Sequence, residues 1–346
     1  MFKTTLTSAA ALVCALALIP PAAAAIAADG AACKGGPLET KSITVMADWL
    51  PWASQAGMWE AKHKGIFTEL GLDVDVKAPP NPADPIKLVA AKRVHFSMTY
   101  VPEVMLSREQ QIPITTVGVL MQTIDSGLAF LPDKNPIKSV QDLKGKTLGV
   151  GPKADAQAYL RTLLESAGLK REDVKVVDPG FAHVQMVQAE RVDAIHALRF
   201  GEARVLTLRQ KKENKPDAGI LLYRDHGVPA FHYMLLASNE EWVAKNPNVA
   251  CAFLKGTMLG MQSALEDPTY VNKFITDARP GVYSLEENTD RWEHTLPQWK
   301  TKEGKMLRSD PELWKQAQAW AVKVNLIKPT TESYESYFTN AYVPKQ

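Results

Sequence analysis

Residues 43–52 read ITVMADWLPW, an apolar run that leads directly into a loop with two tryptophans. A helical segment over residues 58–64 and a second apolar strand over 72–76 follow this loop. A strand, a helix and a second strand in this order indicate a parallel α/β unit. Open α/β sheets bind their ligands at the carboxyl ends of their strands. Because Trp49 and Trp52 follow such an end, the sequence predicts a site for a planar small molecule.

The first 27 residues predict a signal peptide for export. Lys3 supplies a positive start, residues 9–18 are apolar, and the small residues at 22–27 fit a cleavage site. The apolar run is too short to span a bilayer, which takes about 20 residues. The surroundings of the first two cysteines fit a lipoprotein signal poorly. We therefore expect a soluble protein that is secreted to the periplasm.

Length and charge narrow the class of protein. A chain of 346 residues can bury a large core and by its length predicts two domains. Its formal net charge is +2, which is too small to favour binding to nucleic acid or to an anionic membrane. The cysteines that remain after export, Cys33 and Cys251, are compatible with a disulfide and equally with two separate thiols.

Strand and helix patterns alternate along most of the chain and predict an α/β fold with mostly parallel sheets. The middle block, about 130–230, carries a complete set of alternating elements of its own. We expect two lobes with a cleft between them, joined by two hinge crossings near 122–131 and 228–235. The predicted division is a signal peptide at 1–27, lobe 1 at 28–128 and 232–346, and lobe 2 at 129–231.

Several segments together resemble a known family. Residues 41–76 resemble the opening of the type II periplasmic solute-binding proteins, and more narrowly of their NMT1/THI5-like branch. Further matching segments are 96–104, 139–150, 191–194, 225–229 and 236–268. They occur in the order that the family has and cover about residues 40–270.

The resemblance implies a type II periplasmic-binding-protein fold and a receptor that delivers its ligand to an ABC permease in the inner membrane. Binders of thiamine-pyrimidine precursors in this branch place a tryptophan and an acidic residue in the cleft, at the positions of Trp49 and Glu202. Residues 52–57, 199–201 and 230–232 depart from the usual pattern of the branch. Sulfonates, aromatic acids and flavin-type molecules therefore remain alternatives to an aminopyrimidine-like ligand.

Five candidate residues come from the first part of the chain. Trp49 and Trp52 could stack on a flat ligand or close the core between strand and helix. Tyr100 offers a ring and a hydroxyl where a strand gives way to a helix. Glu103, in the first turn of that helix, could face the cleft or complement the helix dipole. Ser126, at the predicted first crossing, could hold a polar ligand edge or belong to a hinge turn with Gly127.

Three further candidates lie farther along the chain. Gly151 precedes a helix whose first amides could bind an anion with help from Lys153, although a structural turn is the favoured interpretation. Glu202 could pair with Arg199 or Arg204 or could meet a ligand donor. His232 is the histidine that we expect nearest the cleft.

We expect binding without chemistry. The histidines lack the spacing of metal ligands, and no catalytic triad or carboxylate pair is visible from spacing. The expectation is a monomer without catalytic residues, metal or cofactor. The branch also contains pyrimidine synthases, which rely on a cysteine-rich iron motif, so an enzyme is the less favoured alternative, together with a ligand-sensing module.

Overall fold

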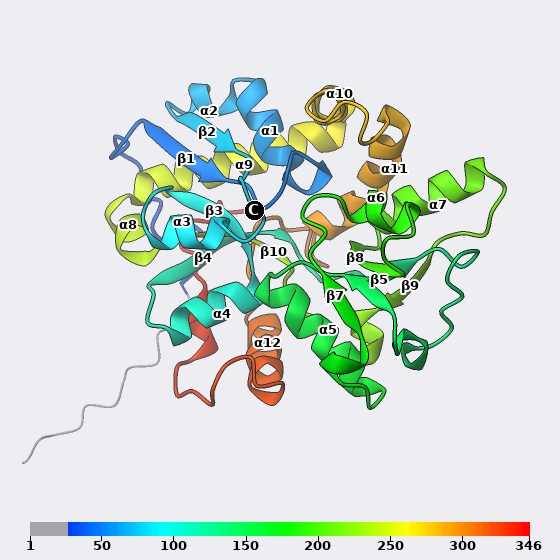
Figure 1. Cartoon of the computed structure of the whole chain (residues 1–346). Helices are drawn as coiled ribbons and strands as arrows, with labels where there is room; N and C mark the ends of the chain where they lie inside the picture. The colour runs from blue at the N-terminus through cyan, green and yellow to red at the C-terminus, as the bar shows by residue number, and fades with distance from the viewer. Residues whose placement is uncertain (1–26) are drawn as a thin grey trace, which may run out of the picture.

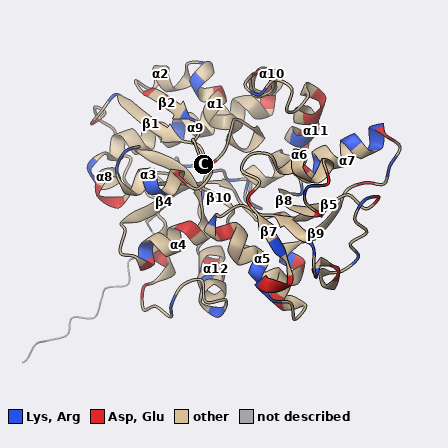
Figure 2. Cartoon of the chain, in the orientation of Figure 1, with Lys and Arg blue, Asp and Glu red and all other residues tan. Residues whose placement is uncertain are grey.

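The structure is a computed structural model that describes residues 27–346. The predicted signal peptide lies outside the described residues except for Ala27. Two five-stranded sheets, each covered by helices, form two lobes that lie side by side (Figure 1). Lysine, arginine and acidic residues are interspersed over both lobes (Figure 2), as the small net charge predicts. Across residues 27–346, no helix combines the length and the apolar character that crossing a membrane requires.

The first sheet has the strand order β2-β1-β3-β10-β4. Its strands are β1 (Ser42–Met46), β2 (Asp73–Lys77), β3 (Phe96–Tyr100), β4 (Ile114–Met121) and β10 (Met234–Asn239). The helices from the same parts of the chain are α1 (Ala56–His63), α2 (Ile66–Glu69), α3 (Pro85–Ala90), α4 (Val101–Glu109), α8 (Glu240–Lys245), α9 (Pro247–Glu266), α10 (Thr269–Asp277), α11 (Leu285–Thr295) and α12 (Pro311–Lys323).

The second sheet has the strand order β7-β6-β8-β5-β9. Its strands are β5 (Ser126–Phe130), β6 (Thr147–Gly149), β7 (Lys175–Val177), β8 (Ala194–Leu198) and β9 (Gly219–Leu222). The helices of this lobe are α5 (Ala154–Ser166), α6 (His183–Gln188) and α7 (Glu202–Lys212).

The sheets are mixed, so the expectation of mostly parallel sheets is wrong. Of the eight strand pairings within residues 27–346, four are parallel and four are antiparallel. The antiparallel pairings all involve β10 in the first sheet and β5 in the second. These are the strands that follow each crossing, and each runs antiparallel to both of its neighbours in the sheet that it joins.

The first crossing is shorter than predicted. β4 ends at Met121 and β5 begins at Ser126, three residues before the predicted start of lobe 2 at residue 129. Ser126 and Gly127 therefore begin a strand and do not form a hinge turn. Glycine is needed there because a Cβ atom at Gly127 would lie 2.1 Å from the carbonyl oxygen of Leu221 on the neighbouring strand.

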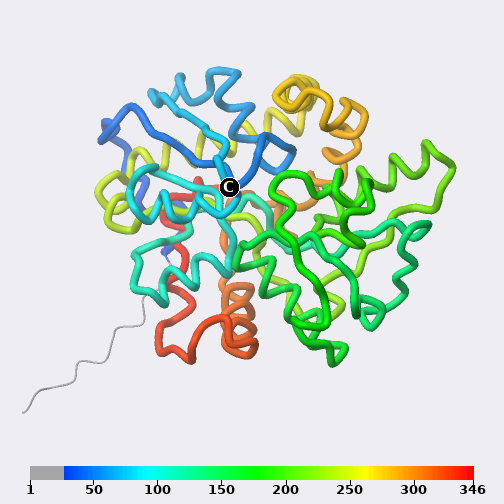
Figure 3. The backbone as a smooth tube through the Cα atoms, viewed as in Figure 1, coloured from blue at the N-terminus to red at the C-terminus, as the bar shows by residue number. Residues whose placement is uncertain are grey.

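Close packing of α1 on α9 fixes the loop that carries the two tryptophans. A Cβ atom at Gly260 would lie 2.0 Å from the carbonyl oxygen of Gly57, so the two helices touch at paired glycines. Figure 3 shows these segments, blue and yellow, side by side although they are far apart in the sequence. The 3-10 turn Ala53–Gln55 between the loop and α1 is fully buried, which holds the loop against the first sheet.

Covalent and aromatic contacts hold the outer segments. Cys33 and Cys251 form a disulfide with a Cα–Cα distance of 5.7 Å, which joins the N-terminal tail to α9. Trp292 and Trp299 are buried and meet edge to face at 5.2 Å between ring centroids, so both rings serve packing.

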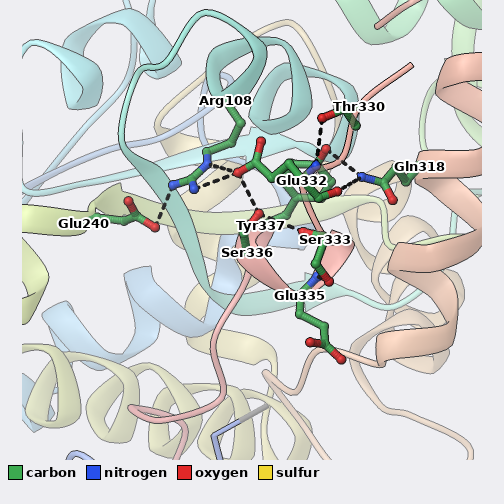
Figure 4. A network of polar contacts seen from close by, with 9 residues as sticks. All are labelled: Arg108, Glu240, Gln318, Thr330, Glu332, Ser333, Glu335, Ser336 and Tyr337. Atoms are coloured by element: carbon green, nitrogen blue, oxygen red, sulfur yellow. Dashed lines mark hydrogen bonds and ion pairs between the residues drawn. The ribbon is translucent and has the colours of Figure 1, made fainter. Parts of the chain in front are cut away.

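The C-terminal segment is anchored on α4 by a polar network around Arg108 (Figure 4). Its guanidinium donates from Nε and Nη2 to Glu332 at 2.9 and 2.7 Å and pairs with Glu240 at 2.6 Å. Ser336 donates to the same Glu332 carboxylate at 2.7 Å, and Gln318 donates to the Glu332 carbonyl at 2.9 Å. The network fixes α4, whose first turn reaches the cleft.

Candidate functional site

A cavity lies between the two lobes, where strand ends from both sheets meet. The loop after β1 and the end of β3 form one side, and the loop after β6 and the end of β8 form the other. Its volume of about 80 Å³ is several times the ~10–15 Å³ that one water needs. The lining residues are Asp48, Trp49, Trp52, Asn81, Pro82, Tyr100, Gly151, Pro152, Lys153, Asp155, Ala156, Asp178, Gly180, His183, His196, Leu198, Glu202 and Tyr233.

Trp49 spans the cleft. It follows β1 of the first lobe, but its ring meets Phe181 of the second lobe edge-on at 4.6 Å and His183 at 5.5 Å between centroids. The side chain is half-buried and lines the cavity. Trp49 therefore forms an aromatic wall of the cavity that contacts both lobes.

Trp52 is more deeply buried, at 4 % exposure, and also lines the cavity. The guanidinium of Arg291 lies 5.3 Å from its ring centroid, in the range of a cation–π contact. The indole N–H has no hydrogen-bond partner within the described residues. Trp52 therefore packs against α11 and exposes only part of its surface to the cavity.

A chain of hydrogen bonds orients Tyr100. Its hydroxyl donates to Asp48 Oδ2 at 2.5 Å, and Gln55 Nε2 donates to the other oxygen of Asp48 at 3.0 Å. Trp59 Nε1 in turn donates to Gln55 at 3.0 Å. Burial and the charge of Asp48 raise the pKa of Tyr100 well above its ordinary value, so the phenol stays protonated and can keep donating.

Asp155 brings a buried carboxyl group to the cavity. It lies in the first turn of α5 and is 2 % exposed. Within residues 27–346 its Oδ1 atom has no hydrogen-bond partner. Burial, together with the nearby charge of Glu103, raises the pKa of Asp155 to about 7, against a lowering effect of Lys153. This carboxyl group can therefore accept or donate a hydrogen bond near neutral pH.

Lys153 is the residue before α5, and its side chain crosses the cleft. The ammonium lies 4.4 Å from the ring centroid of Tyr100 and 6.0 Å from that of Trp49. Both rings belong to the first lobe, whereas Lys153 belongs to the second. The lysine thus contributes a cation–π contact between the lobes.

Glu103 lies beside the cavity and lines an adjoining groove. Thr99 Oγ1 donates to its Oε2 atom at 2.6 Å. Burial raises the pKa of Glu103, while Lys153 and the hydrogen bond from Thr99 act in the opposite direction. The residue faces the cleft, as one of the two sequence interpretations expects, but outside the inner cavity.

Glu202 opens α7 and lines the cavity. Its Oε2 atom accepts a hydrogen bond from the backbone N–H of Leu198 at 3.1 Å. The two arginines considered as its partners are paired elsewhere: Arg199 with Asp125 and Arg204 with Asp290. The arginine-pairing interpretation is therefore wrong, and the carboxylate remains directed at the cavity.

Of the candidates Ser126, Gly151 and His232, only Gly151 is among the residues that line the cavity. Gly151 lines the cavity, and its carbonyl accepts a hydrogen bond from the side chain of Gln157 at 2.7 Å. Ser126 begins β5, where its buried hydroxyl lies outside the lining residues. His232 is fully buried away from the cavity, because Asp310 N–H donates to its Nε2 at 2.7 Å and its Nδ1 meets the carbonyl of Gln122 at 3.0 Å.

Two histidines that sequence reasoning did not select, His183 and His196, also line the cavity. Burial lowers the pKa of His183, and burial together with the charges of His183 and Lys153 lowers that of His196 to about 3. His196 also lies 3.1 Å from the hydroxyl of Tyr223. Both imidazoles are therefore neutral near pH 7.

Other cavity residues were missed for a shared reason. Asp48 and Asp155 stand directly beside the tryptophan loop and the glycine turn that the sequence singled out, whereas Lys153 was considered only as a partner for an anion. A polar residue at the end of each apolar strand was the available signal. Tyr233 had no such signal, since its ring reaches Tyr100, at 5.0 Å between centroids, only through strand pairing. Within the part of the chain that the structure describes, no cluster of three or more His, Cys, Asp or Glu side chains is arranged to hold a metal ion.

Comparisons with known proteins agree with this architecture. A formylaminopyrimidine-binding protein of Halalkalibacterium halodurans is 28 % identical over 81 % of this chain and 84 % of its own length. A 4-amino-5-hydroxymethyl-2-methylpyrimidine phosphate synthase of Saccharomyces cerevisiae is 24 % identical over 88 % of this chain and 89 % of its own.

Among solved structures, the alkanesulfonate-binding protein SsuA of Xanthomonas axonopodis pv. citri aligns with a TM-score of 0.67 and 13 % identity. The alignment covers 87 % of this chain and 99 % of that one, which confirms the periplasmic-binding-protein fold. The model of the family described as NMT1/THI5 like matches residues 52–270. The fold and the relatives support a solute-binding role, and the chain belongs to the NMT1/THI5-like family.

Proposed function

We propose that the protein is the extracytoplasmic receptor of an ABC importer that captures a small planar heterocycle bearing amino groups. The observation that carries the proposal is the cavity between the lobes, where aromatic rings and carboxyl groups converge. The ligand would lie against Trp49 and Tyr100, with Trp52 and Gly151 at its margins. Asp155 and Glu202, both on the second lobe, would receive its amino groups.

The charges in the cavity favour a ligand that donates hydrogen bonds. Among the described residues, four with carboxyl groups line the cavity, and Lys153 contributes one ammonium group. The two imidazoles that line it are neutral near pH 7. An anion such as a sulfonate would meet net negative charge there. The N-terminus of α5, which could attract an anion, already carries Asp155 in its first turn. The aminopyrimidine class is therefore favoured over sulfonates and aromatic acids.

We propose capture and hand-over without a chemical step. The synthase alternative requires cysteines that could hold iron, and Cys33 and Cys251 are joined in a disulfide outside the cavity lining. A disulfide also suits an oxidising compartment, in agreement with the predicted signal peptide. We infer a monomer in the periplasm whose two lobes close on the ligand and present it to a permease.

Calorimetric titration of the purified protein tests the ligand class. We expect 4-amino-5-hydroxymethyl-2-methylpyrimidine to bind with a micromolar or lower Kd, and ethanesulfonate, benzoate and riboflavin to bind at least 100-fold more weakly. Glu202→Gln should weaken the pyrimidine about tenfold because a charged acceptor is lost. The same change at the exposed Glu286 should leave the Kd unchanged. Binding of only the sulfonate or the benzoate would overturn the proposal.

A further inference from the structure

A groove adjoins the inner cavity on its outer side. Its volume is about 620 Å³, compared with about 80 Å³ for the cavity. Helices α3 and α4 of the first lobe form one wall, and the residues at the start of α5 form the other. Its lining residues are Asn81, Ala83, Asp84, Ile86, Lys87, Ala90, Glu103, Leu106, Ser107, Gln110, Ile112, Pro152, Lys153 and Ala154.

The two spaces meet at three shared residues, Asn81, Pro152 and Lys153, which line both. Two buried carboxyl groups flank this junction: Asp155 faces the cavity, and Glu103 faces the groove. Lys153 stands between the two spaces with its ammonium over the ring of Tyr100. A molecule that fills the cavity and extends past Lys153 would enter the groove directly.

We propose that the groove is a second compartment of the binding site, which receives a flexible chain carried by the ring in the inner cavity. This inference rests on the proposed function and narrows the substrate class to a heterocycle with an extended substituent. A hydrogen-bond donor near the ring would meet Glu103 at the junction. Carbon atoms farther along the chain would lie against Leu106 and Ile86.

The groove fits a chain because its chemistry changes along its length. Ile86, Leu106 and Ile112 are half-buried aliphatic side chains on its wall, and burying methylene groups against them is favourable. Lys87 and Gln110 are exposed, so a polar chain end would stay hydrated. The inner cavity, in contrast, has a volume of only about 80 Å³ and is lined by aromatic rings and carboxyl groups.

Two acylated probes test the second compartment by calorimetric titration. Both carry 4-amino-5-aminomethyl-2-methylpyrimidine, with either a formyl group or a 6-hydroxyhexanoyl group on the aminomethyl nitrogen. We expect the long probe to bind at least tenfold more tightly. Leu106→Trp, which fills the groove, should weaken the long probe at least tenfold and the formyl probe less than twofold. The same substitution at Leu285, which is 52 % exposed, is the matched control and should change neither Kd.

A second variant, Ile86→Trp, fills the groove from α3 and repeats the test if the Leu106 variant does not fold. Equal affinities of the two probes for the unmodified protein, or equal losses for both probes in the tryptophan variants, would overturn the second compartment while leaving the proposed function intact. Failure of both probes to bind the unmodified protein would overturn the proposed function and this inference with it.

Discussion

The Arg108 network and the cavity are both clusters of polar side chains, but they differ in how fully their polar groups are paired. In the Arg108 network, the guanidinium of Arg108 is paired with the carboxylates of both Glu240 and Glu332 (Figure 4). In the cavity, Asp155 Oδ1 and Trp52 Nε1 have no hydrogen-bond partner within the described residues. The difference separates a cluster whose charges are paired within the fold from one that keeps unpaired polar atoms, as the proposed ligand site requires.

The pKa shifts of Arg108 and Asp155 show the same difference between the two clusters. Burial lowers the pKa of Arg108, but its hydrogen bonds with Glu332 and Glu240 outweigh burial and raise it. At Asp155, burial raises the pKa, and the nearby Glu103 adds to the effect. The charged form is thus stabilised at Arg108 and destabilised at Asp155. A ligand that donates hydrogen bonds to Asp155 would supply the missing stabilisation.

Arg108→Ala should have the largest effect and only on stability. We expect a loss of about 2–3 kcal/mol in the free energy of unfolding, because two carboxylates lose their shared partner in a half-buried setting. Urea unfolding measures this loss, and ligand titration should give an unchanged Kd. Arg108→Lys should restore only part of the stability, since an ammonium cannot reproduce the guanidinium geometry. A large loss of affinity would contradict the separation of the two clusters.

Trp49→Ala should show the reverse pattern. Loss of a ring at the centre of a binding site costs about 2 kcal/mol, so we expect a roughly 30-fold higher Kd for the aminopyrimidine. The free energy of unfolding should change by less than that amount, because the ring is half-buried in the cleft. Trp242→Ala is the matched control: Trp242 is a half-buried tryptophan that packs against Phe96, and its loss should leave the Kd unchanged.

The sequence could predict the features that depend on local patterns, but not those that depend on tertiary contacts. Alternating apolar runs gave the strands and most helices, and the tryptophans after β1 marked one side of the cavity. Asp155 stands beside the glycine turn, but its burial, at 2 % exposure, comes from tertiary packing that the sequence does not show. His232 looked like a cleft residue because it precedes β10. Its ring nitrogens are instead bound by backbone groups of Gln122 and Asp310, contacts that only the tertiary fold creates.

Asp155→Asn should change how stability depends on pH. The pKa is raised from 3.8 to about 7 on folding, so the unfolded chain loses this proton at lower pH than the folded protein does. The free energy of unfolding therefore falls as pH rises from about 4 to about 7 and levels off above. At pH 8 the variant should be about 1–2 kcal/mol more stable than the unmodified protein, and at pH 4 the gain should vanish.

Urea unfolding at pH 4, 6 and 8 measures this effect. Asp225→Asn, on an exposed turn of the same lobe, should keep the pH dependence of the unmodified protein. The Asp155 variant should also bind the aminopyrimidine about tenfold more weakly, because the unpartnered carboxyl oxygen is lost. A variant that is less stable at pH 8 would mean that Asp155 supports the fold.

Glu335→Ala should have the smallest effect, and it tests whether the Arg108 network depends on side chains or on backbone geometry. Figure 4 shows the Glu335 carboxylate pointing away from Arg108, while its backbone N–H donates to Ser333 Oγ at 3.3 Å. Removing the side chain leaves this backbone contact in place, so we expect a change of less than about 0.5 kcal/mol in urea unfolding. Glu332→Ala, three residues earlier, removes the carboxylate that accepts from Arg108 and Ser336 and should cost several times more. Equal losses for the two variants would mean that the segment is held by its backbone turn, and that the full pairing around Arg108 contributes little to stability.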